Sequence, residues 1–380
     1  MSLTHDTLQE IACRFAIEEG KISVTPFGHG HINSTYLVEY DGDGAGEKRL
    51  ILQKVNTTVF PKIRELTDNM AAVTSFLQKK IAGEGGDPRR ETLNMIPLVS
   101  ASESDQAWQR YLYHEEGTPD YWRMFRFVTG ASSYEQPRRL EDLYQSGAAF
   151  GKFQKMLSDF PVDRLYEVIP GFHDTRARYA ALVKAVNDDV CGRADSCRPE
   201  IEFSLKRKGL SELFEGLLER GELPVRVAHN DTKTNNVMID DVTGKGICVV
   251  DLDTVMPGLA PFDFGDAVRF CTNTALEDEP DTGKVGFSLD RYRAFLEGFM
   301  EGCGGALTPA ETAHMSDGAM VMTYEVGIRF LTDYLQGDPY FKTDYETHNL
   351  VRTRTQLRLL ELMEAHKEEM DEIAVKLTKE

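Results

Sequence analysis

The chain has few cysteines, no long apolar run and no secretory signal. Its six cysteines among 380 residues include no pair with the two-residue gap of a zinc knuckle, and a chain of this length needs no disulfide framework. No apolar stretch approaches the roughly twenty residues that a membrane span needs. These absences predict free thiols and a cytoplasmic protein without a membrane partner.

The chain also has fewer basic residues than acidic ones. Lysine and arginine number 43 against 62 aspartates and glutamates, which gives a formal net charge of −19. Because an acidic surface repels phosphate backbones, the composition argues against a nucleic-acid partner. An anionic small substrate would need a metal ion or a local basic cluster. The sequence therefore predicts small-molecule substrates and leaves the oligomeric state open.

The hydrophobic pattern divides the chain into two parts of different character. Residues 1–128 contain short alternating segments typical of strands, with helical periodicity at 4–19 and 60–81. Residues 129–380 are mostly helical, except for a strand-rich segment at 225–254. We expect an α+β protein with a small antiparallel-sheet lobe and a larger helical lobe. A cleft between two such lobes is a natural ligand site.

The strand-rich segment has the strongest chemical pattern. The strands "NVMID" and "ICVVD" flank the turn "DVTGKG", so Asn236 and Asp251 should meet at the open end of a hairpin. Amide and carboxylate oxygens suit magnesium. Asp231 precedes Asn236 by five residues and should face the same point. This is the kinase spacing, in which the first aspartate accepts a hydroxyl proton and the other two groups hold the metal.

Two other interpretations of this segment remain. Each polar residue taken alone is more typical of a turn cap or a strand end. The run "ICVVDLDTV" also matches the motif of haloacid-dehalogenase-like phosphatases, in which Asp251 would be the nucleophile. That motif normally opens its domain, whereas 250 residues precede it here. The combined pattern therefore favours a kinase.

A glycine-rich segment, "PFGHGHINSTY", lies between the first two expected strands. Gly28 and Gly30 give the backbone room to fold over phosphates, although an ordinary hairpin turn has the same composition. His31 and Asn33 are either caps of this turn or polar contacts to a substrate. A kinase site needs such a loop in the first lobe, which raises the weight of the phosphate interpretation.

The third strand should carry a cation for the phosphates, and "LILQKVN" offers Lys54 beside Gln53. Strand alternation turns only one of the two toward the cleft, and the sequence leaves the choice open. If Gln53 faces the cleft, the usual phosphate lysine is missing. The following helix offers Glu65 or Asp68 as an acidic partner, and neither stands out.

Arg329 is a cation in an otherwise apolar helix. Glu325 and Asp333 lie four residues on either side of it, so an ion pair within the helix is one interpretation. Substrate binding is the other, and the sequence does not decide between them.

Several segments together resemble a known family. "HNDTKTNN" and "VVDLDT" resemble the aminoglycoside phosphotransferase and choline kinase-like superfamily. "GHGHINSTYLV", "LILQKVNTTVFP", "FGDAVRF", "GIRFLTDYLQGDPYF" and "HNLVRTRTQ" resemble its N-acetylhexosamine 1-kinase branch. The resemblance runs from about residue 5 to about residue 365, and the peripheral segments are more specific than the catalytic ones.

The resemblance implies a two-lobed protein kinase-like fold that uses ATP and Mg²⁺. It implies phosphorylation of the anomeric hydroxyl of N-acetylglucosamine or N-acetylgalactosamine, with Asp231 as the base. A kinase of another small alcohol, such as an amino alcohol, and an inactive nucleotide-binding protein remain as alternatives. The resemblance assigns the other groups as follows: Asn236 and Asp251 to the metal, Phe127 and Val128 to adenine, and His31, Asn33, Asn230 and Arg329 to the sugar.

Overall fold

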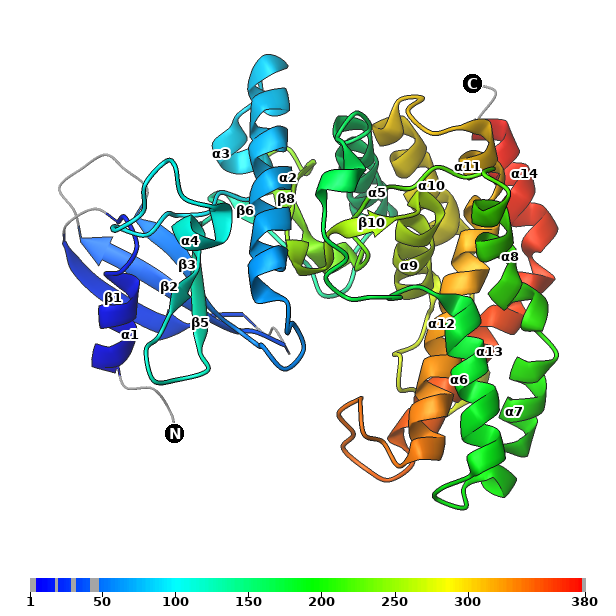
Figure 1. Cartoon of the computed structure of the whole chain (residues 1–380). Coiled ribbons are helices and arrows are strands. Elements are labelled where there is room, and N and C mark those ends of the chain that lie inside the picture. Colours follow the sequence, from blue (N-terminus) through cyan, green and yellow to red (C-terminus); the bar gives the residue numbers. More distant parts are fainter. Residues whose placement is uncertain (1–4, 18–19, 29–31, 42–47, 378–380) are drawn as a thin grey trace.

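The computed structural model describes residues 5–17, 20–28, 32–41 and 48–377. Figure 1 shows a smaller part containing a sheet, drawn in blue and cyan, beside a larger helical part. The expected α+β architecture with two lobes is confirmed. Among the described residues, no helix is long and apolar enough to cross a membrane.

The small lobe is built on a five-stranded antiparallel sheet in the order β1-β2-β3-β5-β4. Its strands are β1 (Lys21–Pro26), β2 (Ser34–Asp41), β3 (Arg49–Val55), β4 (Tyr113–His114) and β5 (Tyr121–Arg126). Alternate side chains point to opposite faces. Leu52 and Trp122 pack with helix α1 (His5–Ala12) on the outer face. Val55 and Phe125 join the core shared with the large lobe.

The first helix is shorter than the sequence predicts. Periodicity indicates a helix over residues 4–19, but α1 ends at Ala12. Beyond it, Phe15 forms a β-bridge with Leu98, and the Ala16 N–H donates to the Pro97 carbonyl at 2.8 Å. Pairing with a distant extended segment therefore replaces the last helical turns that local periodicity favours.

Helix α2 (Ile63–Gly83) lies between the sheet and the large lobe (Figure 1). Its apolar side chains, including Leu66 and Met70, belong to the same buried cluster as residues of the large lobe. The Asn69 amide nitrogen donates to the Val255 carbonyl at 3.0 Å and to the Tyr166 carbonyl at 2.8 Å. The short helices α3 (Pro88–Glu91) and α4 (Ala107–Tyr111) complete this lobe.

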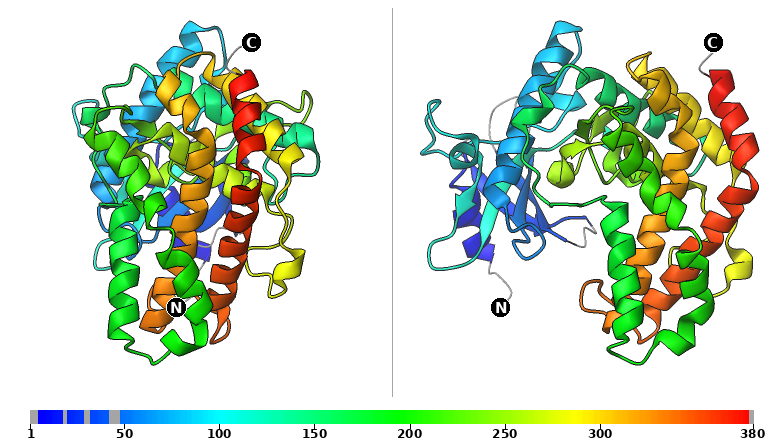
Figure 2. Two further views of the ribbon diagram at one scale, coloured as in Figure 1. Left: turned by 90° about the vertical axis from the view of Figure 1, so that its right-hand side faces the viewer. Right: turned by 45° about the vertical axis from the view of Figure 1, so that its right-hand side comes forward.

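The large lobe is mostly helical. Figure 2 shows the long helix α12, in orange, running beside α13. Helices α5 and α10 pack so closely that a Cβ on Gly147 would lie 2.2 Å from the Phe295 carbonyl oxygen. Between residues 198 and 219 the chain forms two separate helices, α7 and α8. The helices are α5 (Leu140–Met156), α6 (Thr175–Asp188), α7 (Arg198–Leu205), α8 (Lys208–Glu219), α9 (Ala260–Thr272), α10 (Leu289–Cys303), α11 (Pro309–Ala313), α12 (Met315–Gln336), α13 (His348–Ala365) and α14 (Lys367–Leu377).

Two small antiparallel sheets interrupt these helices. The expected hairpin is present as β8 (Val237–Asp240) and β9 (Gly246–Val249), with β6 (Ala131–Ser132) on the other side of β8. Strands β7 (Arg226–Ala228) and β10 (Met256–Gly258) form the second pair. The connection from β5 to β6 contains residue 128, where we expect the domain boundary, and that division remains a prediction.

Candidate active site

One buried carboxylate, that of Asp263, accepts hydrogen bonds from the loop after β7. Asp263, on α9, is 2% exposed and accepts the backbone N–H groups of His229 at 2.9 Å and Asn230 at 2.8 Å. The Gln154 amide donates to the same carboxylate at 2.7 Å. Burial is the largest influence on Asp263 and raises its pKa. This aspartate therefore fixes the loop that carries Asp231.

Asn230 has a backbone conformation that most residues avoid. Its φ is +62°, in the left-handed region that glycine, asparagine and aspartate tolerate best. Its side-chain nitrogen donates to the carbonyls of Ala228 at 3.3 Å and Thr254 at 3.0 Å. The residue type is therefore explained by the turn itself, and the side chain is largely engaged within the loop.

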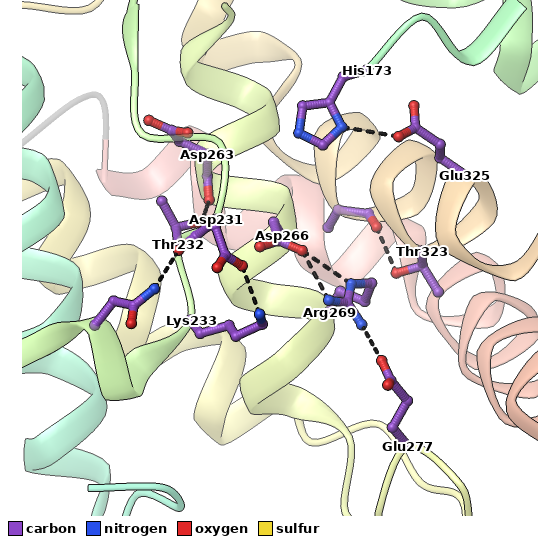
Figure 3. Close-up of polar contacts among 12 residues, drawn as sticks. His173, Asp231, Thr232, Lys233, Asp263, Asp266, Arg269, Glu277, Thr323 and Glu325 are labelled. Atoms are coloured by element: carbon purple, nitrogen blue, oxygen red, sulfur yellow. Dashed lines mark hydrogen bonds and ion pairs between the residues drawn. The ribbon is translucent and has the colours of Figure 1, made fainter. Parts of the chain in front are cut away.

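Asp231 lies at the end of this loop with a cation beside it. Its Oδ1 is 2.8 Å from the Lys233 Nζ, and its side chain is 25% exposed. Burial alone lowers the pKa of Lys233, but the nearby carboxylates of Asp231 and Asp266 outweigh it and raise that pKa. In the described part of the chain, Asp231 Oδ2 has no protein partner, which leaves one oxygen open for an incoming hydroxyl (Figure 3).

A second ion pair supports Lys233 from α9. The Arg269 guanidinium donates to Asp266 Oδ1 at 2.9 and 3.1 Å and to Glu277 at 3.0 Å. Burial raises the pKa of Asp266, but Arg269, Lys233 and His173 together outweigh it and lower that pKa. Figure 3 shows this chain of charges beside the loop that carries Asp231, with the His173–Glu325 pair next to it. Asp266 therefore stays ionised near Lys233.

The hairpin presents two oxygen donors, as its spacing predicts. The Asn236 side-chain nitrogen donates to the Asp231 carbonyl at 2.8 Å, which leaves its oxygen for another partner. Asp251 follows β9 with a φ of +59°, and its side chain is exposed. Although part of its surface is exposed, the surrounding protein removes enough water that this desolvation, with the carboxylates of Asp253 and Asp231, raises the pKa of Asp251 to about 6. An amide oxygen and an ionisable carboxylate fit Mg²⁺ chemically.

Asn236 and Asp251 do not form a complete metal site without further ligands. Among the described residues, no group of three or more His, Cys, Asp or Glu side chains could hold a metal ion. Mg²⁺ commonly binds one or two protein carboxylates and completes its shell with substrate phosphates and water. The open pair Asn236 and Asp251 fits that mode of binding better than a permanent metal site.

The structure separates the two candidate residues of β3. Gln53 pairs in register with Arg123 of β5, and its Oε1 accepts the Arg123 Nε at 3.0 Å and Nη2 at 2.8 Å. Lys54 points to the opposite face, where it forms an ion pair with Asp120 and lies over the Trp122 ring. Of the two candidates for the phosphates that the sequence left open, Lys54 is therefore on the outer face of the sheet, and Gln53 is on the face toward the large lobe.

The glycine loop is described only in part. Gly28 has a φ of +75°, which glycine adopts without strain. Gly30 and His31 lie outside the described residues. Asn33 donates from its side chain to Asp253 Oδ2 at 2.7 Å and accepts the Asn56 N–H at 3.0 Å. Both ends of the Asn33 amide therefore contact protein outside the glycine turn, in a link between the two lobes. The proposed sugar contact of Asn33 remains a prediction.

The connection after β5 has the features of an adenine site. The Phe127 ring packs edge-on against Phe27 at 5.8 Å and lies under the Arg49 guanidinium at 4.3 Å. Val128 is buried, and in the described part of the chain its backbone N–H has no hydrogen-bond partner. A free N–H beside an apolar side chain is what an adenine edge requires.

Arg329 does not form the ion pair that its helix position allows. Glu325 instead binds His173 at 2.9 Å and Thr175 at 2.7 Å, and Asp333 accepts the N–H groups of Tyr340 and Phe341 at 2.9 Å each. Within the described ranges, Arg329 has no hydrogen bond or ion pair. Its guanidinium lies near the Phe172 and Phe341 rings, at 5.7 and 5.6 Å.

A hollow of about 330 Å³ opens beside Asn230, between β10, α8 and the segment before α6. His173 and Glu215 line it, and each has a buried side-chain atom, Nε2 and Oε2 respectively, without a hydrogen-bond partner among the residues that the structure describes. Burial raises the pKa of Glu215. The remaining wall combines aliphatic side chains with three aromatic rings and two carboxylates, those of Phe172, Phe214, Phe262, Glu167 and Asp174.

Comparison with known proteins identifies the class of this site. The model of the phosphotransferase enzyme family matches residues 23–298, and the chain belongs to that family. Several solved structures share its protein kinase-like fold, at identities that show the fold alone.

A choline kinase from Cryptosporidium parvum Iowa II matches with a TM-score of 0.58 at 12% identity, covering 97% of this chain and 98% of that one. A microcompartment-associated aminopropanol kinase matches at 0.55 and 14%, covering 96% and 98%. A spectinomycin phosphotransferase solved with ADP and spectinomycin matches at 0.53 and 11%, covering 97% and 99%. All three are similar in fold to the whole of this chain.

Sequence reasoning did not single out several residues that shape the site. Asp263 stands directly before "FGDAVRF", a segment that served only for the resemblance, and Lys233 lies inside the quoted motif "HNDTKTNN". Arg123 and Asp253 are 130 residues apart, yet their side chains are in contact. The sequence gave one signal for this pair. Arg123 in "YWRMF" and Asp253 in "VVDLD" are charged residues among apolar neighbours, which indicates that each needs a buried partner.

Proposed function

We propose that the protein is an ATP-dependent kinase that phosphorylates the anomeric hydroxyl of N-acetylhexosamines. The observation that carries the kinase assignment is the convergence of Asp231, Asn236 and Asp251 on one loop and hairpin, in a chain of the phosphotransferase family. The sugar assignment rests on the resemblance of the peripheral segments and on the basic groups described below.

In this proposal each residue has a defined task. Asp231 accepts the acceptor's hydroxyl proton through its open oxygen, late in the transfer. Asn236 and Asp251 would hold Mg²⁺, which neutralises charge on the triphosphate. Lys233, whose positive charge the nearby Asp266 carboxylate favours, would stabilise charge that develops on the transferred phosphoryl group. Asp263 keeps the loop in place, so little reorganisation is needed at the moment of reaction.

The acceptor region contains guanidinium groups that disfavour a cationic alcohol. Arg329 has no ion pair in the part of the chain that is described. Arg178 donates to the carbonyls of Gly171 and Phe172, and burial together with the nearby Arg329 lowers its pKa. Two guanidinium groups that repel each other attract oxygen-rich neutral acceptors and repel ammonium groups. This supports a sugar over an amino alcohol.

A second candidate function follows from the hollow beside Asn230. Its aromatic rings and carboxylates, including Glu215 and Asp174, have the composition that binds organic ammonium ions. A kinase of a small amino alcohol would use this hollow instead of the guanidinium side. The choline and aminopropanol kinases that share the fold make this the alternative to test.

Phosphorus NMR of the products tests both candidates directly. The protein is incubated with ATP and Mg²⁺ and, in separate tubes, N-acetylglucosamine, N-acetylgalactosamine, choline and ethanolamine. We expect a sugar 1-phosphate signal in a sugar tube and only slow ATP hydrolysis in the amine tubes. Product in the amine tubes alone would replace the sugar proposal with the second candidate. No product in any tube from a protein that binds ATP would retain the nucleotide site and reject both acceptors.

A further inference from the structure

A kinase site usually draws one phosphate-neutralising cation from the third strand of its small lobe. In this chain Lys54 faces away from the cleft, and the residue facing the cleft is the neutral Gln53. The cation on that face is Arg123, directly opposite Gln53 on β5. The small lobe therefore brings a positive charge to the cleft from a different strand.

Hydrogen bonds fix the Arg123 guanidinium group almost completely. It is 2% exposed, and four of its N–H directions are used. Nη1 and Nη2 donate to the two oxygens of Asp253 at 2.5 and 2.8 Å, and Nε and Nη2 donate to Gln53 Oε1. A guanidinium fits a carboxylate in this two-pronged manner better than a lysine does. The group is therefore fixed in direction as well as in place.

Both carboxylate oxygens of Asp253 also accept hydrogen bonds. Asp253 is 3% exposed, and its Oδ2 also accepts the Asn33 side-chain nitrogen at 2.7 Å. Both of its oxygens thus contact the small lobe, although Asp253 belongs to the large lobe, in the 3-10 turn Leu252–Thr254. This use of its lone pairs removes Asp253 from metal binding and leaves Asp251 as the open carboxylate of the turn.

The network joins the parts that must enclose a triphosphate. Asn33 immediately precedes β2, the strand after the glycine loop, and its side-chain oxygen accepts the Asn56 N–H after β3. Arg123 and Gln53 belong to the small-lobe sheet, on the face turned toward the large lobe. Asp253 lies two residues from Asp251. A buried carboxylate without its partner would add an uncompensated negative charge next to Asp251 and Asp231. The pair therefore controls both the charge and the spacing of the cleft.

On the basis of the proposed kinase function, we propose that Arg123 is a positioning residue of the nucleotide site that compensates for the missing strand-β3 lysine. It acts through Asp253: it neutralises this carboxylate and ties it to the small lobe, so that Asp251 alone faces the metal and no extra negative charge faces the triphosphate.

Calorimetric titration with Mg-ATP tests this proposal with the full-length chain. In Arg123→Gln, the freed Asp253 carboxylate should raise the Kd for Mg-ATP by about an order of magnitude or more. The matched control is Lys54→Gln, which removes a cation from the adjacent residue on the outer face and should change that Kd less than about twofold. An unchanged Kd in Arg123→Gln would overturn the proposal.

The double variant Arg123→Met/Asp253→Leu separates positioning from direct contact and covers the case in which the single variant fails to fold. Replacing a buried ion pair by apolar side chains preserves stability in other proteins, so this variant should fold. If Arg123 acts through Asp253, the double variant should bind Mg-ATP within about fivefold of the wild type. Weak binding in the double variant would mean that Arg123 contacts the nucleotide itself, and would overturn the positioning role.

The same titrations distinguish this inference from the kinase assignment. A wild-type protein that binds no Mg-ATP would remove the proposed function and the inference together. Wild-type binding with an unaffected Arg123→Gln variant would remove the inference alone. A purely structural pair would lower the melting temperature of Arg123→Gln while leaving its Kd for Mg-ATP unchanged.

Discussion

Two aspartates at the catalytic loop differ in how their oxygens are used. Asp263 is almost fully buried, and its carboxylate accepts two backbone N–H groups and the Gln154 amide. Asp231 is partly exposed, and among the described residues its carboxylate contacts one side chain, that of Lys233 at 2.8 Å. A carboxylate that holds structure has its lone pairs filled, whereas one available for chemistry keeps an oxygen open. The following predictions test this difference, beginning with the largest expected effect.

Asp231→Asn should abolish most of the turnover and leave the fold unchanged. Removing a positioned general base commonly costs about 10²–10⁴-fold in rate, and the amide keeps the size of the side chain. We expect kcat to fall within that range while the Kd for Mg-ATP and the melting temperature change little. Measured kcat equal to that of the wild type would show that Asp231 is not the base.

Asp263→Asn, in contrast to Asp231→Asn, should mainly lower the stability of the protein. An amide in place of the carboxylate keeps one acceptor oxygen and turns its NH2 donor toward the N–H group of either His229 or Asn230, which leaves that buried donor unpaired. We expect the free energy of unfolding in urea to fall by about 3 kcal/mol. Glu103→Gln, which changes an exposed carboxylate, is the control and should leave the midpoint unchanged. A stable Asp263→Asn protein would contradict the holding role.

Asp251 should make nucleotide binding depend on pH. Its pKa is raised to about 6, so protons compete with Mg²⁺ below that pH and the affinity for Mg-ATP should fall about tenfold per pH unit. Asp251→Asn should bind weakly at all pH values and lose this dependence, as measured by calorimetry between pH 5 and about 8. A wild-type affinity that stays flat across pH 6 would remove Asp251 from the metal site.

The metal-free protein should respond to pH in the opposite direction. The folded state holds the Asp251 proton more tightly than the unfolded chain does, because the folded pKa is raised. This carboxyl therefore adds stability as the pH falls from about 6 toward its ordinary range, and that contribution is lost as the pH rises through about 6. Comparing melting temperatures of the wild type and Asp251→Asn over this window isolates the effect.

Asn230 allows backbone and side-chain effects to be separated, and its expected effect is the smallest. Alanine at a φ of +62° is strained by about 1 kcal/mol, whereas glycine adopts this conformation freely. We expect Asn230→Ala to be less stable than Asn230→Gly in urea. If Asn230 also binds the acceptor, both variants should raise the acceptor KM equally, and an unchanged KM in Asn230→Gly would limit the residue to shaping the loop.

Much of the fold was predictable because its signals are local. Strand alternation and helical periodicity gave the two-lobed α+β architecture, and the hairpin spacing gave the relation between Asn236 and Asp251. The first helix was predicted too long, because its end depends on pairing of Phe15 with Leu98. Such pairing leaves no periodic trace in either segment.

The sequence by itself determined the reactive groups of the hairpin and loop, because a hairpin brings its own ends together and fixed spacing sets which side chains meet. Only the tertiary structure decided that Gln53 rather than Lys54 faces the cleft, and that Arg329 keeps no helix partner. It alone joined Arg123 to Asp253, since the distance along the chain between two charges says nothing about which of them will be buried together. Burial makes that choice, because a charge removed from water requires a partner wherever the fold can supply one.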